Sequence, residues 1–335
     1  MGHHGWVHVV AAPDKFKGTA TAPEITAAVA RAVEEVGGRC TEVPMADGGD
    51  GTLVALGGPN RKTTVTGPLG APVEAAWRLD RGTAVIEMAR TSGLVLAGGR
   101  DGNDPLAATT TGVGELINAA IDGGAERIIV GVGGSATTDG GLGAVDVIAS
   151  PAHLKGVDLV VACDVRTAFV DAAAVFGPQK GASPAQVAML TNRLRTLVDT
   201  YRSRFGVDVR DLPRSGAAGG LAGGLAALGA RLVDGFEIVA ETAGLEAAIE
   251  SADLVVTGEG FLDEESFDGK VVGGVADVAE RHGVPVVAVA GQVFDGVEAR
   301  IDAISLVESF GMDRAMDEPT GCVYDAILDR LRSGL

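Results

Sequence analysis

The sequence predicts an α/β protein that has a doubly wound, mostly parallel sheet domain with a second α/β domain inserted into it. Near both ends of the chain, short apolar runs lead into polar loops and then into segments with helically spaced apolar residues. This order is typical of an open parallel sheet. The middle of the chain instead carries strand-like runs separated by tight turns. We therefore expect a discontinuous domain of residues 1–61 plus 241–335 and an inserted domain of residues 62–240.

The first element is a strand over residues 7–12, where an apolar run ends at a polar loop. A helix follows over residues 21–36, because its apolar residues recur at helical spacing. Glu24 is placed to form a capping box with Thr21, and a glycine pair ends the helix. The next elements are a strand near residues 40–43, a polar loop over 44–51 and a short helix over 53–56.

The middle of the chain begins with three strand-like runs, at residues 63–66, 73–79 and 83–88. The tripeptide Asp80-Arg81-Gly82 is typical of a hairpin turn, so we expect antiparallel pairing here. The later elements of the inserted domain are a helix over 112–125, a strand over 128–132, a helix over 184–204 and a small-residue helix opened by the glycine-rich tract 215–224.

The parallel pattern returns after residue 252, which favours a Rossmann- or flavodoxin-like sheet built from both ends of the chain. The predicted elements are a strand over 254–256, a loop over 257–263, a helix over 271–282, a strand over 285–290 and a last strand over 304–307.

The composition excludes several classes of function. The net charge is −18 and aromatic residues make up 4% of the chain, which argues against binding of nucleic acid. No apolar run is long enough for a membrane span, and the start of the chain, which contains His3 and His4, lacks the pattern of a secretion signal. Three widely spaced cysteines fit a reducing compartment. We expect a cytoplasmic protein, and the sequence leaves homo-oligomerisation open.

Polar residues follow most of the predicted strands. Ligands of open parallel sheets bind outside the carboxyl ends of the strands. Carboxylates that hold Mg²⁺, lysines that neutralise phosphate and glycine amides that surround it fit phosphoryl transfer. The candidate residues in these loops are Asp14, Lys15, Lys17, Asp47, Gly48, Gly49, Asp50, Gly133, Gly134, Ser135, Asp139, Asp164, Glu259 and Asp263.

Neither of two common nucleotide-binding motifs indicates a different function strongly. The chain has no G-x-x-x-x-G-K-[ST] sequence, so it is not a P-loop protein. Residues 131–136, GVGGSA, fit the dinucleotide fingerprint G-x-G-x-x-A after a strand. A single match in a chain with 50 glycines is weak, and it leaves a dinucleotide-dependent oxidoreductase as a less favoured alternative.

The ordered segments of the chain resemble the type I glycerate kinase family over nearly its whole length. The segments that carry the resemblance are APDKFKG at 12–18, PMADGGDGT at 44–52, VTGPLGAPV at 65–73, VIEMARTSGL at 85–94, DPLAATTTGVGEL at 104–116, VGGSATTDGG at 132–141, VACDV at 161–165, VFGPQKGA at 175–182, GAAGG at 216–220, ADLVVTGEG at 252–260 and GK at 269–270.

This resemblance implies ATP- and Mg²⁺-dependent phosphorylation of D-glycerate, with 2-phosphoglycerate as the usual product of bacterial members. It also implies two α/β domains with the active site in the cleft between them. On this hypothesis Asp47 or Asp139 is the catalytic base, and Lys17 beside Asp14 binds a charged end of the substrate or a phosphate. Glu259 and Asp263 are candidates for Mg²⁺, the loop at Ser135 for phosphate oxygens, and Lys180 and Lys270 for screening the transferred group.

Three departures from the family pattern keep another alternative open, a non-catalytic member or one with a different substrate. The segment between Gly141 and Leu159 is shorter than usual. Arg166-Thr167-Ala168 stands where the family tends to have an Asn-Pro-Leu turn. Glu265-Ser266 replaces a usual Gln-Thr, which adds a negative charge near the expected phosphate site.

Overall fold

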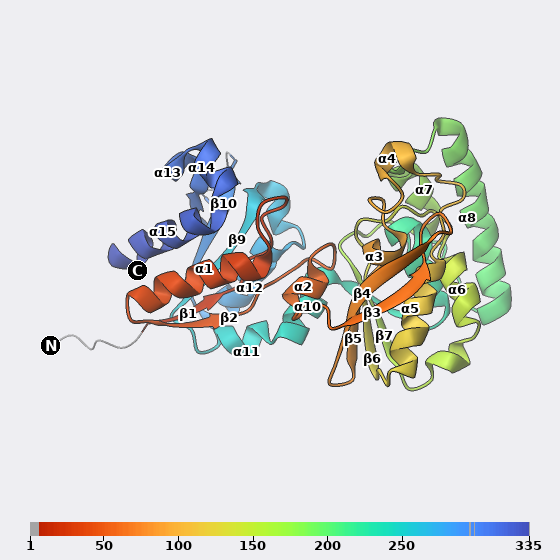
Figure 1. Cartoon of the computed structure of the whole chain (residues 1–335), viewed down its shortest axis with the longest axis horizontal. Helices are drawn as coiled ribbons and strands as arrows, with labels where there is room; N and C mark the ends of the chain where they lie inside the picture. Colours follow the sequence, from red (N-terminus) through yellow and green to blue (C-terminus); the bar gives the residue numbers. More distant parts are fainter. Residues whose placement is uncertain (1–6, 295, 298, 335) are drawn as a thin grey trace. The chain divides into compact units, whose positions relative to one another are not determined.

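The computed structural model describes residues 7–294, 296–297 and 299–334, so His3 and His4 lie outside the described residues. The chain forms two compact units (Figure 1). Unit 1 comprises residues 1–47, 54–56 and 236–335, and unit 2 comprises residues 48–53 and 57–235. The sequence placed the boundaries at 61/62 and 240/241. The main difference is the segment 48–53, which belongs to unit 2 although the chain around it belongs to unit 1.

Unit 1 is built on a five-stranded, entirely parallel sheet with the strand order β11-β10-β9-β1-β2. Successive residues of β1 point to opposite faces. Val9 packs with residues of α1 and α15, whereas Val10 packs with residues of α10, α11 and α12. The elements are β1 (His8–Ala11), α1 (Ala22–Glu35), β2 (Arg39–Glu42), α10 (Gly235–Ala243), α11 (Leu245–Ile249), β9 (Leu254–Leu262), α12 (Val271–His282), β10 (Val286–Val293), β11 (Asp302–Ser305), α13 (Leu306–Phe310), α14 (Met312–Asp317) and α15 (Pro319–Arg332).

The winding of this sheet reverses between β1 and β9. The chain leaves β1 through α1, on one face, to reach β2. It leaves β9 through α12, on the opposite face, to reach β10. The doubly wound prediction is therefore confirmed, and the strands β1 and β9 flank the topological switch point, where such sheets bind their ligands.

Unit 2 contains a six-stranded mixed sheet whose strand order, β3-β4-β5-β6-β7-β8, follows the chain. The first three strands are antiparallel, as predicted, and the remaining pairs are parallel. Arg81 and Gly82 have φ values of 47° and 78° in the β4–β5 turn, as a two-residue hairpin turn requires. The elements are β3 (Arg61–Thr66), β4 (Pro72–Asp80), β5 (Thr83–Glu87), α3 (Ala89–Ser92), α4 (Gly99–Gly102), α5 (Thr111–Asp122), β6 (Arg127–Gly131), α6 (Leu142–Ile148), β7 (Asp158–Cys163), α7 (Ala172–Phe176), α8 (Pro184–Phe205), α9 (Leu221–Ala227) and β8 (Arg231–Asp234); the short α2 (Thr52–Ala55) spans the boundary between the units.

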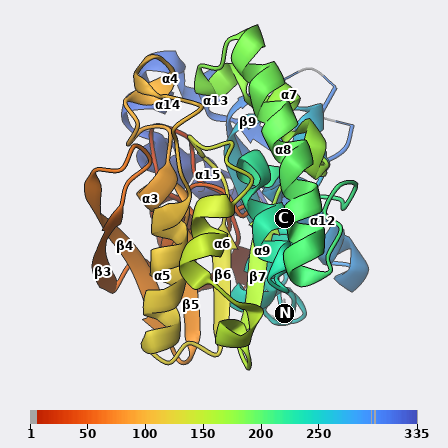
Figure 2. The ribbon, with the colours of Figure 1, turned by 90° about the vertical axis from the view of Figure 1, so that its right-hand side faces the viewer.

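The parallel part of the unit 2 sheet is wound in one direction. Figure 2 shows α5 and α6 lying along the same side of β5, β6 and β7. Apolar side chains of α5, α6, α8 and α9 form one core with those of β6 and β7. Each new strand is added beyond the last, so the order of the strands does not reverse within β5–β8.

Local signals explain several of the helix ends. The capping box of Thr21 and Glu24 forms as expected. Ser183 and Gln186 form a second one at the start of α8. Two expectations were wrong. Strand β9 continues to Leu262 because it pairs with β10 as far as Val293, so Glu259 lies on a strand and not in a loop. The last strand ends at Ser305, whose side chain caps α13.

The shortened segment between Gly141 and Leu159 still completes a parallel crossover. It holds α6, a 3₁₀ helix at Pro151–Leu154 and the start of β7. Strand β7 pairs with β6 from Arg127↔Asp158 onward. The shortening therefore leaves the sheet of unit 2 continuous.

No helix in the described part of the chain is long and apolar enough to cross a membrane. The three cysteines are free thiols, and two of them are buried.

Candidate active site

A cluster of acidic residues lies at the switch point of unit 1. The chain continues past β1 beside β9, where the backbone N–H groups of Ala12 and Asp14 donate to the carbonyls of Val256 and Gly258 at 2.7 and 2.8 Å. This pairing places Asp14 beside the part of β9 that carries Glu259. The sequence predicted both residues for the site, and the structure brings them to the same edge of the sheet.

Asp14 is a buried carboxyl group, with 9% of the residue exposed. Its Oδ1 accepts a hydrogen bond of 2.6 Å from the backbone N–H of Lys15 and lies 3.6 Å from the Lys15 Nζ. Burial raises the pKa of Asp14 to about 7, and the negative charges of Asp47 and Glu259 add to this effect, whereas Lys15 opposes it. A carboxyl group with this pKa can both accept and release a proton near neutral pH.

Glu259 is half-buried, and its Oε1 is enclosed without a hydrogen-bond partner among the described residues. Burial raises the pKa of this carboxyl, with further contributions from Asp263 and Asp47, against the effects of Ser266 and Lys270. A buried polar atom without a partner is uncommon in folded proteins. This oxygen is therefore a candidate ligand atom.

The other predicted site residues of unit 1 differ in how many contacts they make with the protein. Asp263 caps a 3₁₀ helix, and its Oδ1 accepts hydrogen bonds from the backbone N–H and the hydroxyl of Ser266 at 3.2 and 3.3 Å. Lys270 is half-exposed at the start of α12, and its Nζ lies 3.8 Å from the carboxylate of Glu265. Lys17 is exposed on the turn that follows Asp14.

The acidic cluster of unit 1, formed by Asp14, Asp47 and Glu259, fits a magnesium ion that is also bound by phosphate. Mg²⁺ at such sites takes one or two carboxylates, water and phosphate oxygens instead of a cage made only of protein ligands. The Oε1 of Glu259, which has no hydrogen-bond partner among the described residues, could supply one such ligand. Within residues 7–294, 296–297 and 299–334, no three His, Cys, Asp or Glu side chains converge to hold a metal by themselves.

Asp139, in unit 2, has a different environment. Its Oδ2 accepts hydrogen bonds from the N–H and hydroxyl of Thr110 at 2.9 and 2.8 Å and from the Gly143 N–H at 3.3 Å. Its Oδ1 accepts from the Gly141 N–H at 3.0 Å. The buried carboxylate thus links the first turns of α5 and α6. Because all four bonds come from the protein, this geometry favours a structural role over that of a base.

Lys180 is fully enclosed, with 2% of the residue exposed. Its Nζ donates a hydrogen bond of 2.7 Å to the carbonyl oxygen of Thr137. Burial lowers the pKa of this ammonium group to about 7, and the charge of Asp139 opposes the shift. Lys180 therefore supports the loop that carries Asp139, and its depth argues against direct contact with a phosphate group.

The glycines of unit 2 allow loops to pack backbone against backbone. A Cβ at Gly48 would lie 2.7 Å from the Cα of Gly235, and one at Gly133 would lie 2.7 Å from the Cα of Gly49. Gly134 has a φ of 70° and is exposed, beside the half-buried Ser135. The exposed amide edge at 134–135 remains a candidate for binding anions.

Asp164, which the sequence also predicted for the site, is exposed directly after β7. The turn that follows it, at Arg166-Thr167, holds the glycine-rich tract, because the carbonyls of Arg166 and Thr167 accept hydrogen bonds from Arg214 and Gly216 at 3.3 and 2.9 Å. These are main-chain contacts. The contacts between this turn and the tract therefore do not use the side chains of Arg166 and Thr167.

The sequence analysis gave no role to Glu87 and Arg90, at the carboxyl end of β5. Glu87 is buried, and its Oε1 accepts hydrogen bonds from the N–H groups of Gly51 and Leu53. Its Oε2 accepts from Arg90 Nε at 2.7 Å. The carboxylate directly after the apolar run Ala84–Ile86 is the sequence signal that could have identified Glu87.

Comparison with known proteins decides the family. The model of the glycerate kinase family matches residues 9–150 and 144–320. The chain belongs to the glycerate kinase family. It is 39% identical to the glycerate 2-kinase of Escherichia coli, across 95% of this chain and 94% of that protein. It is 38% identical to the glycerate kinase of Halalkalibacterium halodurans, across 92% of this chain and 93% of that protein.

The fold is also that of a solved relative. A crystal structure assigned to glycerate kinase 2 from Salmonella typhimurium LT2 superimposes with a TM-score of 0.85 at 34% identity, across 98% of this chain and 99% of that one. Membership of the family identifies the chain as an ATP-dependent kinase. The sequence resemblance is thus confirmed.

The alternative of a dinucleotide-dependent oxidoreductase finds no support in the geometry. The fingerprint requires a helix that opens at its glycines, directly after the strand. Here β6 ends at Gly131 and α6 does not begin until Leu142. The intervening glycines belong to a loop.

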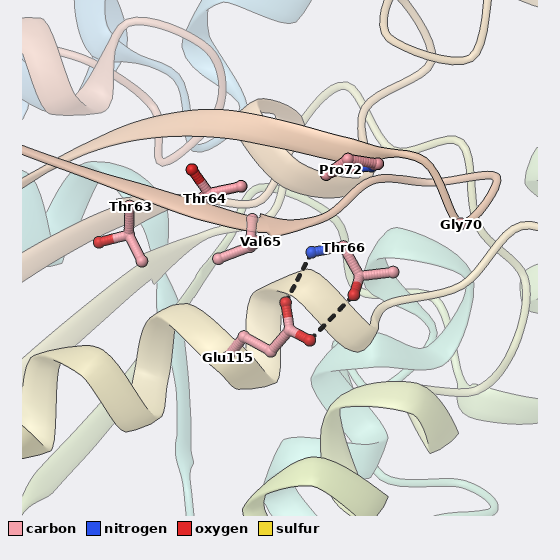
Figure 3. A pocket seen from close by; sticks show the side chains of 7 residues that line it. All are labelled: Thr63, Thr64, Val65, Thr66, Gly70, Pro72 and Glu115. Carbon is pink, nitrogen blue, oxygen red and sulfur yellow. Dashed lines mark hydrogen bonds between the residues drawn. The ribbon is translucent and has the colours of Figure 1, made fainter.

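A shallow groove of about 330 Å³ in unit 2 contains none of the predicted site residues. It lies between the edge strand β3, the β3–β4 turn and α5. Figure 3 shows Glu115 reaching from α5 to Thr66, whose N–H and hydroxyl donate hydrogen bonds of 2.6 and 2.9 Å to its carboxylate. Both oxygens of the Glu115 carboxylate are therefore engaged in hydrogen bonds that hold the end of β3.

Proposed function

We propose that the protein transfers the γ-phosphoryl group of ATP to the 2-hydroxyl of D-glycerate and forms 2-phosphoglycerate. The similarity to proteins named glycerate kinase and glycerate 2-kinase, over more than nine-tenths of both chains, is the observation that carries this proposal. The free thiols and the use of ATP suit the cytoplasm, where we place the reaction.

Asp14 is the general base in this proposal. The sequence alone favoured Asp47 or Asp139, but the carboxylate of Asp139 is occupied by four internal hydrogen bonds. Asp14 combines a buried position with a pKa raised to about 7. It takes the proton of the acceptor hydroxyl as the oxygen attacks the γ-phosphorus, the bond to the bridging oxygen breaks, and ADP leaves with that electron pair.

Glu259 and Asp47 would hold the magnesium ion that accompanies ATP. When bound, the ion supplies positive charge to the phosphate oxygens. Lys17 and Lys270, both with exposed ammonium groups, bring further positive charge to the same unit, which suits the point-charge role of lysine at phosphates. Asp263 orients the segment that follows β9 through its bonds to Ser266.

Unit 2 contributes to anion binding in the same reaction. The exposed amide of Gly134 and the hydroxyl of Ser135 are the groups that we assign to this role, whereas Gly48, Gly49 and Gly133 allow the loops to approach each other.

A second candidate, a non-catalytic member of the family, rests on the departure at Glu265-Ser266. The side chain of Glu265 is 82% exposed and pairs with Lys270, so its charge is in water and not buried at a phosphate site. Ser266 keeps a hydroxyl that bonds to Asp263. The structure of this segment therefore gives the catalytic reading the stronger support.

The direct test is ADP release from ATP, Mg²⁺ and D-glycerate, compared with a control without glycerate. Coupling to enolase without a phosphoglycerate mutase then reports 2-phosphoglycerate alone, because enolase does not use the 3-isomer. We expect glycerate-dependent release at about 1–100 per second and an immediate enolase signal. Release that needs the mutase for an enolase signal would contradict the 2-hydroxyl assignment. Absence of glycerate-dependent release would contradict the kinase function.

A further inference from the structure

The carboxyl end of β5 presents an arginine that is held in place by a buried carboxylate. The side chain of Glu87 is 3% exposed, and that of Arg90 is 34% exposed. Glu87 bonds to Arg90 only through Nε. The two Nη groups have no hydrogen-bond partner in the described part of the chain, so the outer edge of the guanidinium plane is available.

Backbone N–H groups stabilise the negative charge of Glu87 in addition to Arg90. Its Oε1 accepts two backbone hydrogen bonds, of 3.0 Å from Gly51 and 2.9 Å from Leu53. This carboxylate therefore fixes the segment 48–53 to β5 and orients the arginine at the same time. The guanidinium keeps a positive character toward an incoming anion, because the amides share the charge of Glu87.

The turn that carries this arginine packs against a glycine-rich loop. The N–H of Met88 donates to the carbonyl of Gly131 at 2.9 Å, so the turn after β5 follows the end of β6. A Cβ at Gly134 would lie 3.2 Å from the Cβ of Ala89, which puts the residue before Arg90 against the loop assigned to anion binding. Arg90 thus follows the carboxyl end of β5, and the turn that carries it packs against the loop at Gly134.

Two other basic residues of these loops, Lys180 and Arg214, are bonded to the protein itself. Lys180 is buried on the carbonyl of Thr137. Arg214 donates to the carbonyl of Cys163 at 2.6 Å and to the carboxylate of Asp234 at 3.0 Å. Arg90 differs because one edge of its guanidinium is anchored and the other is open.

We propose that Arg90 binds the carboxylate of the acceptor substrate through its two Nη groups and that Glu87 is its positioning residue. This inference rests on the proposed function, since it assigns a partner to the carboxylate of glycerate. Two parallel N–H groups in one plane match the two oxygens of a carboxylate, and this fit distinguishes arginine from lysine. A phosphate of ATP can also form a bidentate pair with a guanidinium group, so the test separates the two anions.

The experiment compares the full-length protein with R90M, R90K and E87Q. Michaelis constants are measured for D-glycerate at saturating ATP and for ATP at saturating D-glycerate. R204M is the matched control, because Arg204 forms an exposed ion pair with Asp146 elsewhere in unit 2. We expect R90M to raise the KM for D-glycerate about tenfold to a hundredfold, with the KM for ATP changed less than about threefold. R204M should change neither constant.

The positioning role of Glu87 has its own signature. E87Q keeps an oxygen for the amides of Gly51 and Leu53 but turns an NH₂ group toward Arg90 Nε. We expect a smaller rise in the KM for D-glycerate than in R90M, with little further loss when both changes are combined. R90K, which keeps the charge without the planar pair of donors, should fall between R90M and the wild type.

Glycerol, which lacks the carboxylate, distinguishes a loss of carboxylate binding from a general loss of the substrate site. Its inhibition constant against D-glycerate should be the same for R90M and the wild type. An equal loss of glycerol and D-glycerate binding in R90M, or a rise confined to the KM for ATP, would overturn the assignment. If the wild type shows no glycerate-dependent ADP release, calorimetric titration with D-glycerate decides. Binding by the wild type that R90M weakens supports Arg90 even though the kinase proposal fails, and absence of binding by the wild type overturns both.

Discussion

The two units place the same kinds of residue at the ends of parallel strands but use them differently. In unit 1, the sheet is wound in both directions from β1 and β9, and the carboxyls of Asp14 and Glu259 lie at the reversal. In unit 2, the strands β5–β8 are added in one direction. The loops after them pack on each other, and Asp139 and Lys180 bond to their own backbone.

This difference distinguishes two roles of a buried polar group, one in function and one in stabilising the fold. The Oε1 of Glu259 has no hydrogen-bond partner in the described part of the chain, and the pKa of Asp14 is raised; both features destabilise the fold and are typical of functional sites. The four hydrogen bonds of Asp139 stabilise the fold and leave little capacity for a substrate proton. Asp14 and Asp139 therefore form a matched pair, one aspartate in each unit, for testing which carries the chemistry.

The largest effect is expected for Asp14→Asn on turnover. The amide cannot accept the proton of the acceptor hydroxyl, although its oxygen can still accept the N–H of Lys15. We expect kcat to fall by about 10²–10⁴-fold, the usual contribution of a general base. ADP release at saturating substrates measures this, with Asp302→Asn as the control, because Asp302 forms an exposed ion pair with Arg330. Normal turnover in Asp14→Asn would remove Asp14 from the role of base.

Asp139→Asn tests the other half of the comparison. The substitution places an NH₂ group against at least one N–H donor and removes the charge that four donors share. We expect the free energy of unfolding to fall by about 2–4 kcal/mol, measured by urea denaturation. Turnover per folded molecule should fall far less than in Asp14→Asn. Unchanged stability together with abolished turnover would instead support the role of base that the sequence suggested.

Glu259→Gln sharpens the assignment within unit 1. The negative charge of Glu259 raises the pKa of Asp14, so its removal should lower that pKa. In the proposed mechanism the deprotonated form of Asp14 is the active one, so the acid limb of the pH profile of kcat/KM should move to lower pH. The Mg²⁺ concentration needed for half-maximal rate should rise about tenfold if one carboxylate ligand is lost. An unmoved acid limb would mean that Asp14 does not control it.

The smallest effect is expected for Lys270→Met. Its ammonium is half-exposed and lies 3.8 Å from an exposed carboxylate, and such pairs contribute little to stability. We expect less than about 0.5 kcal/mol change in the free energy of unfolding and a rise of a few-fold in the KM for ATP. A loss of turnover comparable to that of Asp14→Asn would show that Lys270 is essential and that the ranking within unit 1 is wrong.

Much of the fold follows from sequence signals that act locally. Apolar periodicity, glycine stops and the Thr21–Glu24 capping box predicted several elements close to their observed places, such as α1, α8 and α12. Other elements, such as α15 and β8, were not predicted. The hairpin at Arg81-Gly82 followed from turn chemistry alone. Strand β9 was predicted too short, because its polar second half is stabilised by pairing with β10, a partner distant in sequence.

The site was less accessible to sequence reasoning. Residue types and positions after strands identified Asp14 and Glu259, but the same pattern also selected Asp139, and the family resemblance added Lys180. What separates the two pairs is the set of donors around each side chain, such as Thr110 for Asp139, and these donors come from segments that the sequence does not bring together by any local signal. Glu87 and Arg90 were overlooked for the same reason.

The most direct test of the account is the pH dependence of unfolding for the wild type and Asp14→Asn. The folded-state pKa of Asp14 is raised from 3.8 to about 7, so the folded state binds more protons than the unfolded state in this window, and stability falls as pH rises through it. Asp14→Asn has no such loss. We predict that the variant gains on the order of 1–3 kcal/mol relative to the wild type between pH 5 and pH 8, while it loses turnover. A stability difference that does not change with pH, or a variant with normal turnover, would contradict the claim that unit 1 holds a destabilised carboxyl group for catalysis.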